Sequence, residues 1–131
     1  SICGCYCVPS VPIYTSAKHA VIGLTRSYGV LLKAEGITIN AVAPNVVRTG
    51  ISSDAFYDKL EGEGLLTPMG GLMSAFDEML QNDTSALVYE CGPKGGWNLR
   101  EGAQYLDEES GKCCELISQR AMALHHETSR S

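Results

Sequence analysis

Residues 14–44 have the sequence YTSAKHAVIGLTRSYGVLLKAEGITINAVAP, and this stretch decides the fold. Apolar or small residues recur in it every three or four positions, which predicts a helix from about Tyr14 to Glu35. They are Ala17, Val21, Leu24, Tyr28 and Leu31. Gly36 supplies a C-terminal stop for this helix. The β-rich residues 37–44 follow and end at a proline, as a strand does. A helix followed by such a strand is typical of the second half of a β–α–β crossover.

The segments on either side of this stretch extend the pattern. Residues 1–12 are predicted to be the end of a strand and an irregular loop, because Pro9 and Pro12 disfavour a helix. Residues 45–70 are predicted to be a loop, because glycines and a proline interrupt them. We expect a short helix, a strand and an amphipathic helix further along, over residues 72–83, 85–92 and 107–126 respectively. The last helix has acidic residues at its start and histidines at its end, as the helix dipole prefers.

These elements together predict an α/β fold with parallel strands. The strands near 37–43 and 85–90 are expected to be parallel neighbours or close to it. The predicted organisation has two parts: residues 1–93 form the α/β part, and residues 94–131 form a polar C-terminal extension, in which one amphipathic helix is expected.

Composition narrows the class of protein. The 131 residues are 44% hydrophobic and 19% charged, with a net charge of −5. A mildly acidic chain gives no support to binding of nucleic acid or of an anionic membrane, which would need a basic patch. No apolar run approaches the roughly 20 residues that span a bilayer.

The six cysteines do not have the spacing of a metal site. Zinc ligands usually occur as paired cysteines two to four residues apart, with a second pair or histidines at a matching distance. Here Cys91 stands alone, and Cys113 and Cys114 are adjacent. We expect no metal, and reduced cysteines that act as small hydrophobic residues in a cytoplasmic protein.

Tyr14 and Lys18 are the candidate chemical groups. On a helix, residues four apart lie on the same face. A phenol loses its proton near pH ~10, but a neighbouring ammonium favours the phenolate. Such a tyrosine can exchange a proton with an alcohol or a ketone. Taken alone, such a pair is common, and an amphipathic helix that begins with a tyrosine and has a surface lysine would be the better interpretation.

The surroundings of the pair favour the catalytic interpretation, because the sequence here resembles the short-chain dehydrogenase/reductase family. In that family a serine is followed three residues later by a glycine and thirteen residues later by Tyr-x-[Ala/Ser]-[Ser/Ala]-Lys. Ser1, Gly4, Tyr14 and Lys18 occupy these places. The next strand has the family pattern Asn-x-[Val/Ile]-x-Pro-Gly-x-[Val/Ile]-x-Thr, which is matched by Asn40, Val42, Pro44, Val47 and Thr49. The resemblance covers about residues 1–92, and residues 18–27 look like the branch that contains 15-hydroxyprostaglandin dehydrogenase and many fungal relatives.

The resemblance implies an NAD- or NADP-dependent oxidoreductase that interconverts a secondary alcohol and a ketone. Tyr14 would be the general acid or base, Lys18 would support it and bind the nicotinamide ribose, and Ser1 would hold the substrate oxygen. Pro44, Asn45, Val47 and Thr49 would border the nicotinamide. The resemblance also implies a small-molecule alcohol or ketone as partner and is compatible with a homo-oligomer.

Two departures from the family pattern qualify this expectation. Asn45 stands where the family usually has glycine, and its side chain would lie beside the cofactor. The glycine-rich turn that binds a dinucleotide pyrophosphate is absent from these residues. The resemblance therefore implies that residues 1–93 are the C-terminal half of a dehydrogenase, beginning at its catalytic serine, with part of a Rossmann-like, doubly wound parallel sheet. The alternative is a truncated, inactive relative that serves at most as an interaction module.

Overall fold

A computed structural model describes residues 1–128, and the side chains of residues 1–124. The chain divides into two compact units, Ser1–Arg100 and Glu101–Ser131, which are described separately. Among the described residues, no helix has the length and apolar character needed to cross a membrane.

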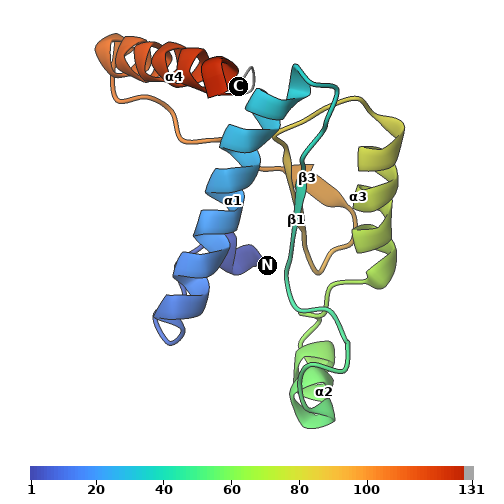
Figure 1. The fold of residues 1–131 in the computed structure, drawn as a ribbon. Helices are drawn as coiled ribbons and strands as arrows, with labels where there is room; N and C mark the ends of the chain where they lie inside the picture. Colours follow the sequence, from blue (N-terminus) through green and yellow to red (C-terminus); the bar gives the residue numbers. More distant parts are fainter. Residues whose placement is uncertain (129–131) are drawn as a thin grey trace. The chain divides into compact units, whose positions relative to one another are not determined.

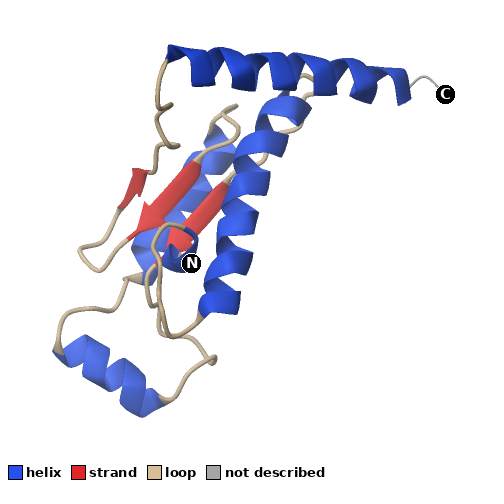
Figure 2. Ribbon diagram, turned by 90° about the vertical axis from the view of Figure 1, so that its left-hand side faces the viewer, coloured by secondary structure: helices blue, strands red, loops and turns tan. Residues whose placement is uncertain are grey.

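The first unit is an α/β structure built on a small mixed sheet. In chain order its elements are η1 (Ile2–Gly4), α1 (Pro12–Lys33), β1 (Ala41–Pro44), α2 (Asp54–Gly62), α3 (Met69–Gln81), β2 (Val88–Cys91) and β3 (Trp97–Leu99). The strand order is β1-β2-β3, with β2 in the centre (Figure 2). β1 and β2 are parallel, as the sequence predicts, with Ala41 opposite Val88 and Pro44 opposite Cys91. β3 pairs with β2 in the antiparallel direction. The sheet of the first unit is therefore mixed and not wholly parallel.

The two faces of the sheet are covered by different helices (Figure 1). Successive residues of a strand point to opposite faces. Ala43 and Val88 therefore pack on Ile22 of α1, whereas Tyr89 and Cys91 pack on Ala75 of α3. The first unit thus forms three layers, with α1 on one face of the sheet and α3 on the other.

The face of α1 that contacts the rest of the unit is not the one marked by its apolar periodicity. The buried residues of α1 are Thr15, Ile22, Thr25 and Gly29. Val21, Leu24 and Tyr28, which define the apolar repeat, are exposed. Small residues face the sheet because the backbones approach closely: a Cβ atom at Gly29 would lie only 2.7 Å from the backbone nitrogen of Ala86.

The prediction for residues 1–12 is right about the irregular loop, which spans residues 5–11, and wrong about the strand and about Pro12. Residues 2–4 form a 3₁₀-helix rather than the end of a strand, with Ser1 as its N-cap. Pro12 begins α1 instead of preventing it, because proline fits the first turn of a helix, where its missing N–H would have no partner.

The loop predicted for residues 45–70 contains α2, and α3 begins at Met69 instead of residue 72. The signal for α2 lies at its start: Ser53 is the N-cap, and its side chain accepts a hydrogen bond from the Phe56 nitrogen. The polar region after Lys94 contains the short strand β3. Three residues are too few for a periodic pattern that would reveal a strand.

The second unit contains α4 (Glu108–Thr128), close to the predicted 107–126. Asp107 accepts a hydrogen bond from the Ser110 nitrogen at 2.8 Å, and this bond lowers the pKa of its carboxyl. Glu108 and Glu109 occupy the first turn as predicted. The predicted histidines, His125 and His126, have side chains outside the described residues.

Gly29 and Gly23 of α1 offer a direct test of this packing. A Cβ at Gly29 would lie within 3 Å of Ala86 and of the Ile39 oxygen. A Cβ at Gly23 would instead project into open space. We expect Gly29→Ala to lower the free energy of unfolding by about 1–3 kcal/mol. We expect Gly23→Ala to raise it by about 0.4–1 kcal/mol, because alanine favours the helix. Urea unfolding of both variants measures the difference, and equal stabilities would contradict the close approach.

Candidate active site

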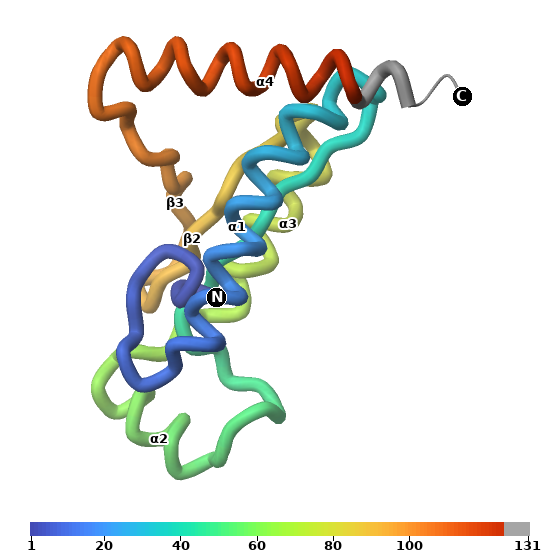
Figure 3. Tube along the Cα trace, turned by 60° about the vertical axis from the view of Figure 1, so that its left-hand side comes forward, coloured from blue at the N-terminus to red at the C-terminus, as the bar shows by residue number. Residues whose placement is uncertain are grey.

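The N-terminal segment and α1 bring three predicted site residues together. Gly4 lies against α1 so closely that a Cβ there would be 2.8 Å from the Lys18 carbonyl oxygen. This contact places η1 beside the first turns of α1 (Figure 3). Ser1, Tyr14 and Lys18 consequently line the same pocket. Gly4 is therefore needed for packing, because a side chain at this position would clash with α1.

The side chains of Tyr14 and Lys18 are in contact. Lys18 Nζ lies 5.2 Å from the centroid of the Tyr14 ring. Burial, and then the positive charge of Lys18, lower the pKa of the Ser1 amino group. The ammonium of Lys18 thus lies over the Tyr14 ring and also acts electrostatically on the Ser1 amino group.

The hydroxyl group of Ser1 has one defined role in the fold. Its Oγ accepts a hydrogen bond from the Cys3 nitrogen at 3.2 Å. Because that bond uses a lone pair, the hydroxyl proton can still be donated to a ligand in the pocket. The geometry suits a group that binds an electronegative oxygen.

The loop that follows β1 forms the opposite side of the pocket. Pro44, Asn45, Val47 and Thr49 all line it. All seven predicted site residues thus surround one cavity of about 520 Å³. They come from the N-terminus, from α1, and from the end of β1 and the loop that follows it.

Asn45 is held by the neighbouring strand. Its Nδ2 donates to the Cys91 carbonyl oxygen at 3.2 Å, and its backbone nitrogen donates to the same oxygen at 2.9 Å. Asn45 is not among the residues with positive φ. The backbone here therefore does not require the glycine of the family pattern, and the side chain is anchored toward β2.

Tyr57 of α2 is a site residue that the sequence interpretation missed. Its side chain has 0% exposure, and it lines the pocket. Its hydroxyl lies 3.3 Å from Thr49 Oγ1 and accepts a hydrogen bond from the Ser52 nitrogen at 3.1 Å. The hydrogen bond with Thr49 lowers the pKa of the Tyr57 hydroxyl. Tyr57 therefore holds the loop that carries Thr49, and the N-cap signal at Ser53 could have placed it on a helix.

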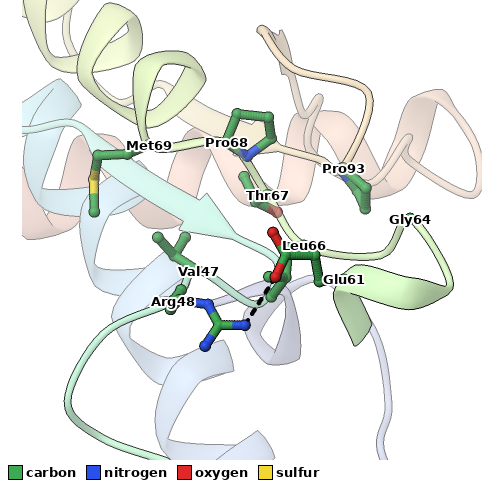
Figure 4. Close-up of a pocket in the computed structure, with 9 residues that line it drawn as sticks. All are labelled: Val47, Arg48, Glu61, Gly64, Leu66, Thr67, Pro68, Met69 and Pro93. Carbon is green, nitrogen blue, oxygen red and sulfur yellow. Dashed lines mark hydrogen bonds and ion pairs between the residues drawn. The ribbon is translucent and has the colours of Figure 1, made fainter. Parts of the chain in front are cut away.

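Arg48 ties the same loop to α2 from the other side. Its guanidinium pairs with Asp58 at 2.7 Å and Glu61 at 3.0 Å. It also lies 5.3 Å from the centroid of the Tyr57 ring. Figure 4 shows Arg48 and Glu61 in a neighbouring pocket of about 390 Å³.

The six cysteines are free thiols. Among the residues that the structure describes, no group of three or more histidine, cysteine or acidic side chains is placed to hold a metal ion.

Comparison with known proteins agrees with this arrangement. Residues 1–59 match the family described as short chain dehydrogenase. The chain is 47% identical over 58 residues to the short-chain dehydrogenase/reductase ATR7 of Stachybotrys chlorohalonatus, covering 44% of this chain and 18% of that protein. It is 41% identical over 56 residues to the 2-dehydro-3-deoxy-D-gluconate 5-dehydrogenase of Bacillus subtilis, covering 43% and 22%. It is 35% identical over 88 residues to the short-chain dehydrogenase RED2 of Pyricularia oryzae, covering 65% and 30%.

The matches thus span less than a third of these three relatives' length. They come from fungi and a bacterium and single out no branch. The family match over residues 1–59 and the named relatives show that this part of the chain is similar to the short-chain dehydrogenase/reductase family.

Proposed function

We propose that residues 1–93 carry the acid–base site of an NAD(P)-dependent oxidoreductase that interconverts a secondary alcohol and a ketone. The observation that carries this proposal is the single pocket lined by Ser1, Tyr14 and Lys18 on one side and the loop after β1 on the other. The names of the relatives, which are dehydrogenases and reductases, support the same reaction class.

Each of the three residues has a distinct role in this proposal. The Tyr14 hydroxyl gives a proton to the ketone oxygen, or takes one from the alcohol, as a general acid or base. The ammonium of Lys18 lies 5.2 Å from the centroid of the Tyr14 ring, beside the proposed site of proton transfer. The Ser1 hydroxyl donates a hydrogen bond to the substrate oxygen, where negative charge develops.

The loop after β1 suits the nicotinamide end of a cofactor. The cavity of about 520 Å³ has room for a flat ring, and Asn45 is drawn to the Cys91 carbonyl. Pro44, Asn45, Val47 and Thr49 would border the ring, and Lys18 would bind the ribose. When bound, NAD or NADP supplies or accepts the hydride. The side chain of Tyr57 keeps Thr49 in place for this contact.

Several finer assignments belong to the same proposal. They are a cytoplasmic location, the branch of 15-hydroxyprostaglandin dehydrogenase, a fungal source, and a polar extension over residues 94–131. A homo-oligomer is also proposed, and the exposed Val21, Leu24 and Tyr28 of α1 would suit such an interface.

The alternative is an inactive relative that acts as an interaction module. It is not favoured, because an inactive module has no need to keep Ser1, Tyr14 and Lys18 around one pocket.

An assay of hydride transfer tests the proposal. Residues 1–131 are joined in one polypeptide to the dinucleotide-binding part of a relative, and the product is mixed with NADH or NADPH and a panel of ketones. We expect loss of the reduced cofactor's absorbance and formation of the secondary alcohol. A folded protein that binds the cofactor but forms no alcohol from any ketone would support the inactive alternative.

A further inference from the structure

The wall of the candidate pocket beyond the reacting groups is apolar. Ile2 and Cys3 come from η1, Phe56 comes from α2, and Leu72 comes from α3. Ile51 lies in the loop between β1 and α2 and is 92% exposed. Large hydrophobic side chains at the mouth of a pocket favour a ligand with a hydrophobic body.

The same pocket has little means of recognising a charged substrate. Its lining contains no arginine, aspartate or glutamate. Lys18 is the one lysine, and its ammonium lies over the Tyr14 ring, where the proposed reaction uses it. The buried Tyr57 hydroxyl is also engaged, with Thr49 and the Ser52 nitrogen.

Arg48 would be the natural partner of an anionic substrate, but it faces elsewhere. Although Val47 and Thr49 on either side of it line the pocket, its guanidinium lines the neighbouring cavity (Figure 4). It is paired there with Asp58 and Glu61, and Asp54 lies 3.7 Å away. A substrate carboxylate or phosphate could use Arg48 only by displacing these acids. A charge that enters an apolar site without a partner is strongly disfavoured.

Resting on the proposed function, we infer that the substrate is an uncharged ketone or secondary alcohol with a hydrophobic body that packs on Ile2, Ile51 and Phe56. Its oxygen meets Ser1 and Tyr14, and its body lies against the apolar wall. Specificity on this inference comes from hydrophobic contact and from the absence of a free cationic side chain in the lining, not from a charged anchor.

Binding of two ketones of equal shape tests the inference without requiring catalysis. The probes are 4-isopropylcyclohexanone, which is neutral, and 4-oxocyclohexanecarboxylate, which has a carboxylate in place of the isopropyl group. They are titrated into the 131-residue chain, with changes in the backbone NMR signals of Ile2, Ile51 and Phe56 as the readout. The Ser1 amino group is acetylated, because its protonated form would add a cation beside Lys18.

We expect the neutral ketone to bind about tenfold or more tightly than the carboxylate, since the latter buries an unpaired charge. Phe56→Ala should weaken its binding about fivefold, through loss of apolar contact. Phe76→Ala is the matched control, because Phe76 is 43% exposed against 44% for Phe56 but does not line the pocket. Ile51→Arg supplies a cation at an exposed position and should shift preference toward the carboxylate.

Equal or tighter binding of the carboxylate to the unaltered chain would overturn the inference, as would failure of both ketones to bind. These outcomes differ from failure of the proposed function, which is measured as alcohol formation in the joined protein. A preference for the neutral ketone without alcohol formation would support a hydrophobic binding site and contradict the proposed reductase activity.

Discussion

Purified by itself, the 131-residue chain is expected to bind NADH and NADPH weakly and to reduce ketones at a negligible rate. Most of the affinity for a dinucleotide comes from contacts with its pyrophosphate and adenosine, made by a glycine-rich turn at a helix N-terminus. These 131 residues contain no such turn. The candidate contacts of Pro44, Val47 and Thr49 would reach only the nicotinamide end.

The loss in rate follows from the loss of positioning. Correct placement of two reacting groups can remove ~7–11 kcal/mol from a barrier. Tyr14 and Lys18 provide proton transfer, but without an anchored cofactor they have no hydride donor at a fixed place. Calorimetric titration with NADH and NADPH, together with a carbonyl reduction assay, measures both quantities. Micromolar binding combined with reduction would contradict the prediction and show that another part of the chain binds the dinucleotide.

The second large effect is expected for Tyr14→Phe in the joined protein that carries a dinucleotide-binding part. The substitution removes the hydroxyl that exchanges the proton and keeps the ring against Lys18. General acid–base catalysis contributes about 10²–10⁴-fold to a rate, so kcat should fall by that factor. Cofactor affinity should change far less, because the ring and Lys18 remain. Steady-state kinetics and a cofactor titration separate the two.

Tyr28→Phe is the matched control for this substitution. Tyr28 lies on the same helix and is 41% exposed, against 48% for Tyr14, but it does not line the pocket. Its loss of a hydroxyl should leave kcat unchanged. Equal kcat values for Tyr14→Phe and the unaltered enzyme would contradict the acid–base role of Tyr14. This test does not depend on the result for the isolated chain.

The strongly periodic and β-rich stretches were predictable because their signals are local. The repeat of residues 14–35 depends on one helical period, and α1 occupies Pro12–Lys33. The β-branched runs that end in proline or glycine correspond to β1 and β2, whose parallel pairing is confirmed. The spacing of Ser1, Gly4, Tyr14 and Lys18 is a property of the sequence, and the roles of these residues stay predictions.

Other features could not be predicted because contacts distant in sequence decide them. α2 has nine residues, and Tyr57 is buried because its hydroxyl meets Thr49 and Ser52. β3 has three residues, which is too short for a periodic pattern, and it exists because it pairs with β2. The 3₁₀-helix at Ile2–Gly4 replaces the predicted strand where Gly4 packs on α1.

By itself, the sequence determined that α1 is a helix, that two strands follow it, and that Tyr14 and Lys18 lie one turn apart. These outcomes rest on backbone preferences and side-chain spacing, which act within a few residues. Tertiary structure decided which face of α1 is buried, where Arg48 turns, and that η1, α1 and the loop after β1 enclose one cavity. Close packing decides these because only small residues such as Gly4 and Gly29 let the backbones approach.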